Sequence, residues 1–131
     1  MSQVCNLKTT LPDLYYNRSK VTIDYLYLYS QQRIVIDAGQ TVTINLDLQL
    51  NFQDQTGTYL PFDIWSPKTL IKELQFVENP IHVQITEGYY RPILQIKNVS
   101  TTKINITMGS AIAQINMDQP FKVIVSSIKN E

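Results

Sequence analysis

The chain has 131 residues, enough for one domain with a single hydrophobic core. Its eleven basic residues balance eleven acidic ones, which argues against a general nucleic-acid or anionic-membrane surface because such surfaces rest on clustered Lys and Arg. No apolar run is long enough for a signal peptide or a membrane span, and the single cysteine, Cys5, excludes an internal disulfide framework, so we expect an intracellular protein that is not secreted.

The first half of the chain is predicted to consist mainly of strands. Residues 1–20 are interpreted as a terminal segment, in which Cys5 is a small apolar filler or a loosely ordered residue. β-Branched and aromatic residues predict a strand at 21–29, and a shorter one follows at 33–36. Residues 42–52 alternate apolar and polar side chains at period two, which predicts a strand with one face in the core.

The second half continues this pattern. Residues 59–65 predict a strand in which Pro61 indicates a sheet edge, and residues 68–76 are the only plausible helix, although a strand also fits there. Further short strands are predicted at 81–85, 93–96, 103–107, 112–117 and 121–125, before a second terminal segment at 126–131. Many short strands separated by turns predict an all-β jelly-roll sandwich or barrel with at most one short helix, in a single domain over residues 1–131.

Four segments resemble, in the same order, the motifs of the homotrimeric dUTPase family. They are Tyr29 to Thr41, Gly57 to Tyr59, Ile85 to Tyr89 and Gly109 to Ile115, the last reading Gly-Ser-Ala-Ile-Ala-Gln-Ile. The resemblance is strongest over residues 25–117. It implies a dUTPase-like fold, a β-clip or jelly-roll barrel, and a homotrimer whose sites form between subunits.

The residues that perform the chemistry of this family are replaced here. Hydrolysis of dUTP with Mg²⁺ requires a carboxylate that activates water and cations that neutralise phosphates. By the resemblance, Tyr27 and Thr86 stand where the family has Asp, and Trp65 stands where it has the Arg of its Arg-Ser-Ser motif. Residues 126–131 also lack the glycine-rich pattern of the family's C-terminal arm. We therefore expect a non-enzyme with no catalytic residue, no cofactor and no metal site.

Two sets of residues remain as candidates for binding. The resemblance assigns a vestigial nucleotide pocket to Ser66, Thr86, Tyr89 and Gln114. Aromatic side chains are enriched at the centres of protein interfaces, so the candidates for partner binding are Tyr27, Trp65 and Tyr90. The stripe of alternate tyrosines around Tyr27 fits a core, a subunit interface or a partner surface, and Trp65 fits a partner pocket or a plug in the vacated site.

Three hypotheses for function follow. The leading one is a virus-encoded, catalytically dead dUTPase-like homotrimer in the host cytoplasm or nucleus that binds a host or viral protein. In length and in its lost motifs the chain is similar to viral dUTPase-derived proteins such as the adenoviral early-region oncoprotein, and its use of Ile, Asn, Lys and Tyr suits an AT-rich viral genome. The alternatives are a structural jelly-roll protein of a virion or capsid, and a protein that retains pyrimidine-nucleotide binding or dUTPase activity.

Overall fold

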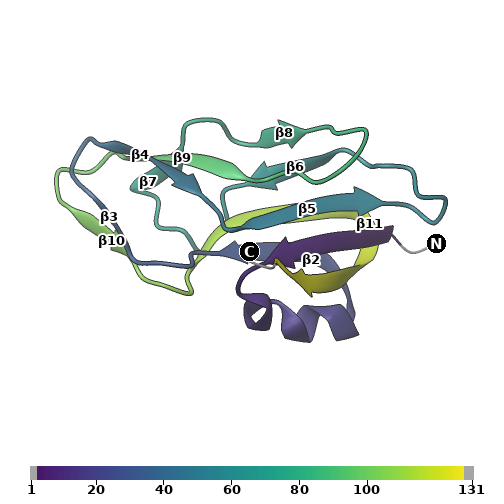
Figure 1. Cartoon of the computed structure of the whole chain (residues 1–131). Coiled ribbons are helices and arrows are strands. Elements are labelled where there is room, and N and C mark those ends of the chain that lie inside the picture. Colours follow the sequence, from purple (N-terminus) through teal and green to yellow (C-terminus); the bar gives the residue numbers. More distant parts are fainter. Residues whose placement is uncertain (1–2, 129–131) are drawn as a thin grey trace.

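The structure is a computed structural model that describes residues 3–128, and these residues form three β-sheets (Figure 1). The largest sheet has the strand order β5-β1-β11-β6-β8, and β2 also pairs with β11. The other two sheets are the pair β10-β3 and the triplet β4-β9-β7. The strands are β1 (Gln3–Thr9), β2 (Thr22–Tyr29), β3 (Ile34–Ile36), β4 (Thr41–Asn45), β5 (Leu48–Gln53), β6 (Phe62–Trp65), β7 (Leu74–Phe76), β8 (Ile81–Val83), β9 (Ile93–Asn98), β10 (Ile104–Ile106) and β11 (Ala111–Ser127).

The first strand lies inside the main sheet, which corrects the interpretation of residues 1–20 as a terminal segment. β1 pairs in parallel with the second half of β11, from Gln3 opposite Phe121 to Thr9 opposite Ser127, and it pairs antiparallel with β5 on its other side. Cys5 is fully buried and packs as an apolar filler of the core. Its thiol has a raised pKa because burial disfavours the thiolate.

The last strand is continuous, whereas the sequence predicted two strands at 112–117 and 121–125. β11 runs from Ala111 to Ser127 with register shifts against β2 on both sides of its first half. Gly109, just before β11, has φ +88° and donates its amide to the Ser30 carbonyl at 2.8 Å, while the Ser30 amide donates to the Ser110 carbonyl at 2.8 Å. Gly109 and Ser110 therefore both lie opposite Ser30, which makes a β-bulge. This bulge requires the positive φ of glycine at Gly109.

The alternating run at 42–52 divides into two strands that lie in different sheets. Ile44, Leu46 and Leu48 all point into the core, as predicted, but the chain leaves the β4 sheet after Asn45 and enters the main sheet at Leu48. The connecting residue Asp47 is held by distant partners. Its amide donates to the Gln31 side-chain oxygen at 2.7 Å, and its carbonyl accepts from the Thr9 hydroxyl at 2.9 Å.

The helix proposed at 68–76 is absent, because this segment forms turns followed by the short strand β7. Leu74 and Phe76 alternate into the core at the period of a strand. Two short 3-10 helices occur instead at η1 (Pro12–Leu14) and η2 (Tyr16–Lys20), and in Figure 1 they lie below the main sheet next to β2. Among residues 3–128, no helix has the length and apolar character needed to span a membrane.

The strands of the main sheet have an inner and an outer face. Leu26 and Leu28 of β2, Ile115 of β11 and Ile64 of β6 are fully buried and belong to one hydrophobic core. The residues between them point outward, because successive side chains of a strand alternate between its two faces. The outer face of β2, β11 and β6 carries several of the candidate residues.

Candidate functional site

Three candidate residues form a row across the outer face of the main sheet. Gln114 of β11 lies opposite Tyr27 of β2 on one side and opposite Trp65 of β6 on the other. Directly opposed side chains of neighbouring strands lie about 5 Å apart at their Cβ atoms and project to the same face. We call this set the Tyr27–Gln114–Trp65 row. It brings together the positions that the dUTPase pattern fills with Asp, Gln and Arg.

Trp65 is an exposed member of this row. Its side chain is 39% exposed, so it does not plug a closed pocket within this chain. Ser66 follows directly, and its amide donates to the Asn79 side-chain oxygen at 3.0 Å. The Gln114 amide group donates to the Asn116 side-chain oxygen at 2.8 Å, which holds Gln114 along its own strand.

A second, more polar row runs beside the first. Asn116 lies opposite Tyr25 of β2 and Asp63 of β6, and Asp63 in turn lies opposite His82 of β8. The Nδ1 atom of His82 and a carboxylate oxygen of Asp63 are 2.7 Å apart. The His82 side chain is 75% exposed, as predicted for a polar position of an alternating strand.

The tyrosines of β2 form a ladder on the outer face of the strand, which runs from the exposed Tyr25 to Tyr29, whose ring packs against the core. The rings of Tyr25 and Tyr27 meet edge to face with centroids 5.2 Å apart, and those of Tyr27 and Tyr29 are 6.5 Å apart. Tyr15 completes the ladder with its ring centroid 5.7 Å from that of Tyr29, and it is fully buried. Burial raises the pKa of Tyr15, so its hydroxyl stays protonated and can act as a donor. Arg18 of η2 donates to the Tyr29 hydroxyl at 3.2 Å.

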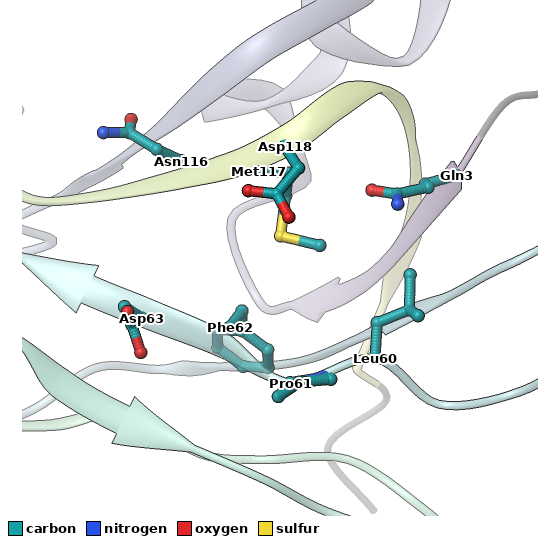
Figure 2. Close-up of a pocket in the computed structure, with 8 residues that line it drawn as sticks. All are labelled: Gln3, Leu60, Pro61, Phe62, Asp63, Asn116, Met117 and Asp118. Carbon is teal, nitrogen blue, oxygen red and sulfur yellow. The ribbon is translucent and has the colours of Figure 1, made fainter.

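A cavity of about 280 Å³ opens beside the middle of the second row, next to Asn116 and Asp63 (Figure 2). Asn116, Met117 and Asp118 line it from β11, and they face Gln3 of β1 and the segment from Leu60 to Asp63. In Figure 2 the Met117 thioether and the Asp118 carboxylate point into this space. Its polar groups include two carboxylates and no cation, so it does not suit a phosphate.

The vestigial nucleotide pocket is divided between two places in the chain. Ser66 follows the carboxyl end of β6, whereas Thr86 follows the carboxyl end of β8, and these two strands are antiparallel. The two residues therefore lie beyond opposite ends of the strand pair, roughly 20 Å apart at the usual rise of about 3.3 Å per residue. Thr86 lines an open hollow with residues 57–59 instead.

The segment that carries Tyr89 and Tyr90 packs at the other edge of the sheet. The ammonium group of Lys8 lies 4.4 Å from the centre of the Tyr89 ring, and the amide of Gly88 donates to the Tyr59 hydroxyl at 3.2 Å. Tyr90 forms a backbone bridge with Leu50 of β5. Its ring is half-buried, and burial together with the charge of Glu78 raises the pKa of Tyr90. Tyr90 is therefore not a neighbour of the Tyr27–Gln114–Trp65 row.

Several residues of this region were not predicted from the sequence. Arg18 lay in a segment interpreted as terminal, and nothing in the sequence alone singles out Asn116 or Asp63. Their positions depend on strand pairings between residues distant in sequence, such as Asn116 with Tyr25. Within residues 3–128, no group of three or more His, Cys, Asp or Glu side chains is arranged to hold a metal ion.

Comparison with known proteins supports the fold. No protein-family model matches the chain, and no curated protein matches its sequence. Among solved structures the chain is similar to the native dUTPase of EIAV, with a TM-score of 0.53 and 18% sequence identity over 72% of this chain and 73% of that chain. An identity this low establishes a shared fold and no shared chemistry. The protein has an all-β dUTPase-like fold, as the sequence predicted.

Proposed function

We propose that the protein is a non-catalytic dUTPase-like protein that acts by binding another protein through the outer face of β2, β11 and β6. The observation that carries this proposal is the Tyr27–Gln114–Trp65 row. Where the dUTPase pattern has a carboxylate and a guanidinium, this face has a phenol and an indole. Exposed Tyr and Trp side chains are the residues that most often dominate the energy of protein interfaces.

The chemistry of the replaced residues supports the lack of catalysis. Neither Tyr27 nor Thr86 can activate a water molecule as a carboxylate does near neutral pH. Pro67, which follows Ser66, has no backbone N–H to offer to a phosphate. Glu87 is exposed next to Thr86, but it lies on the same remote segment and not near Gln114.

The proposal includes a homotrimer, a viral origin and an intracellular location. The trimer is supported by the division of the vestigial pocket, because residues beyond opposite ends of the β6–β8 pair can form a single site only between chains. The trimer does not require the subunits to exchange their last strands. Phe121 and Val123 of β11 are already buried, and β11 pairs there with β1 of the same chain. The composition rich in Ile, Asn, Lys and Tyr supports a viral origin.

The first test is calorimetry of the purified protein with a non-hydrolysable dUTP analogue and Mg²⁺, combined with light scattering to measure the mass. We expect three chain masses and no heat of binding. Micromolar binding of the analogue would contradict the proposal and favour a retained nucleotide site. A monomer would contradict the trimer and leave the binding face untouched.

The second test addresses the binding face itself. Once a partner has been identified, Trp65→Ala and Tyr27→Ala are each expected to weaken its binding by about tenfold or more, as interface hot spots do. Val77→Ala is the matched control, because Val77 is an exposed apolar residue elsewhere on the surface. Equal affinities of all three variants would show that the partner binds another surface.

A further inference from the structure

The outer edge of β2 presents backbone groups that have no strand partner. Among the described residues, β2 pairs only with β11. The Ser30 amide and carbonyl both point to the β11 side, where they bind Ser110 and Gly109. Because backbone groups of a strand alternate between its two edges, those of Tyr25, Tyr27 and Tyr29 point away from β11.

Part of this edge is closed and part is open. The Tyr29 amide donates to the Tyr15 hydroxyl at 3.3 Å, so the 3-10 segment covers that end of the strand. Within the part of the chain that the structure describes, no turn or loop donates to or accepts from the backbone of Tyr25 or Tyr27, and β2 has no strand other than β11 beside it. Two residues thus offer two donors and two acceptors at the spacing of a β-ladder.

The opposite edge of the main sheet is treated differently. Along β5, the Leu50 amide donates to the Tyr90 carbonyl at 2.9 Å, and the Tyr90 amide donates to the Leu50 carbonyl at 2.8 Å. The Phe52 carbonyl accepts from the Leu60 amide at 2.8 Å. Natural proteins usually cover, shorten or charge their edge strands because an open edge is a template for another chain. Here the β5 edge is covered, and the β2 edge at Tyr25 and Tyr27 is left accessible.

A cavity lies next to β2 at Tyr25 and Tyr27. This cavity of about 320 Å³ lies between η2 and this edge, and it is lined by Arg18, Val21, Ile23, Asp24, Tyr25 and Tyr27. The Tyr25 side chain is 49% exposed beside it. The cavity provides room for a chain next to the unpaired backbone groups, and its lining carries one cation, Arg18, and one carboxylate, Asp24.

We infer that the edge of β2 at Tyr25 and Tyr27 binds an extended peptide segment of a partner protein by addition of a β-strand. Only another extended backbone offers donors and acceptors at the spacing needed to satisfy both residues. A carboxylate in the peptide would meet Arg18, whose guanidinium has donors beyond the one used by Tyr29. This inference rests on the proposed function and specifies its mode.

Strand addition would also extend the binding face. A peptide residue opposite Tyr27 projects to the same face as Tyr27, Gln114 and Trp65, which lengthens their row by one strand. The backbone of β2 would then supply affinity, and the aromatic row would select the side chains.

The test begins with selection of a displayed library of random 12-residue peptides on the immobilised full-length chain. Selected peptides are synthesised, and residue-resolved hydrogen exchange is measured with and without each one. We expect the amides of Tyr25 and Tyr27 to exchange at least about tenfold more slowly in the complex, because a new ladder protects them. Methylation of successive peptide nitrogens should weaken binding about fivefold at every second residue and little at those between.

A pair of variants examines the same edge from the protein side. Tyr25→Pro removes the amide that points to the peptide and leaves the ladder with β11 intact, since proline is tolerated on the open side of an edge strand. We expect it to weaken binding at least about fivefold. The control Tyr25→Thr removes the ring but keeps the amide. Should Tyr25→Pro fail to fold, the methylation series on the peptide still decides the question.

Several outcomes would overturn the inference. The first is that no selected peptide binds the chain. The second is that a bound peptide slows hydrogen exchange only in another strand such as β8. The third is that methylation of the peptide weakens binding without alternating from one residue to the next. A dimer that Tyr25→Pro dissociates would show that a second copy of the chain occupies the edge instead. If Tyr25 and Tyr27 stay unprotected while Trp65→Ala still abolishes partner binding, strand addition is wrong and the proposed function stands. If Tyr25 and Tyr27 are protected by the peptide but neither Trp65→Ala nor Tyr27→Ala weakens partner binding, the proposed function is wrong and strand addition stands.

Discussion

The two faces of β2, β11 and β6 differ in how closely they follow the dUTPase pattern. On the inner face Leu26, Ile115 and Ile64 are fully buried and form an apolar core of the usual kind. On the outer face the same strands carry Tyr27, Gln114 and Trp65, of which only Gln114 agrees with the pattern. Alternate residues of a strand contact different surroundings, so one face can change while the other preserves the fold. The outer residues of a dUTPase-like sheet can therefore vary while the inner residues maintain the fold.

The largest expected effect tests whether the inner face of β2 stabilises the fold more than the outer face does, by mutating neighbouring residues on the two faces. Leu26→Ala is expected to lower the free energy of unfolding by about 2–5 kcal/mol, because it leaves a cavity in the core. Tyr27→Ala removes only two partly exposed ring contacts and should cost about 1 kcal/mol. Urea denaturation of both variants checks this. Similar losses would mean that the outer ladder also specifies the fold.

A smaller loss is expected at Asn98, one of several buried polar residues, which lies at the end of β9. Asn98 is fully buried, donates to the Ile36 and Thr102 carbonyls at 2.9 and 2.8 Å, and accepts from the Ser100 amide at 2.9 Å. Asn98→Ala leaves these groups unsatisfied and should cost about 1–3 kcal/mol. Asn105→Ala, at an exposed strand position, is the control for denaturation experiments. An Asn98→Ala variant as stable as the control would contradict the assigned role of this side chain.

The buried titratable groups should make the protein less stable in alkali. Burial raises the pKa of Cys5 and of Tyr15, so the folded state keeps their protons while the unfolded state releases them. Their stabilising effect is complete below about pH 8.5 and is lost as the pH rises, by up to about 1.4 kcal/mol per pH unit for each group. Denaturation curves between pH 7 and 11 measure the loss.

The variant Cys5→Ala separates the two groups. Its decline should begin only near pH 10, where unfolded tyrosines ionise, instead of near pH 8.5. A decline that starts at the same pH in both proteins would show that Cys5 is not responsible.

The smallest effect is expected when two exposed positions are changed to the residues of the dUTPase pattern. Trp65→Arg combined with Thr86→Asp should change the free energy of unfolding by about 0.5 kcal/mol, because both positions are exposed. Circular dichroism and thermal melting of this double variant give the answer. A large loss of stability would mean that the replaced residues have become part of the structural core of the protein.

Local periodicity was sufficient to predict most strands and both faces of 42–52, since alternation is a property of neighbouring residues. It could not show that this run changes sheets at Asp47, because Thr9 and Gln31 hold that residue from afar. β1 was missed for the same reason. Its place depends on β5 and on the last strand and not on its own pattern.

The candidate site was predicted residue by residue but not as a whole. Resemblance to a family marked Tyr27, Trp65 and Gln114 separately, and only strand register shows that they form one row. The same resemblance grouped Ser66 with Thr86, which the antiparallel pairing of β6 and β8 places at opposite ends. Motif order in a family does not say whether the motifs meet within one chain or between chains.

The parallel pairing of the first and last strands has a consequence for how the protein is made. Gln3 to Thr9 lie beside Phe121 to Ser127, so the contact joins residues separated by nearly the whole chain. During synthesis the first strand leaves the ribosome long before its partner exists, and one edge of it must wait unpaired. Such long-range contacts slow folding and expose strand edges to other chains in the meantime. The main sheet is therefore completed only after its last strand has been synthesised.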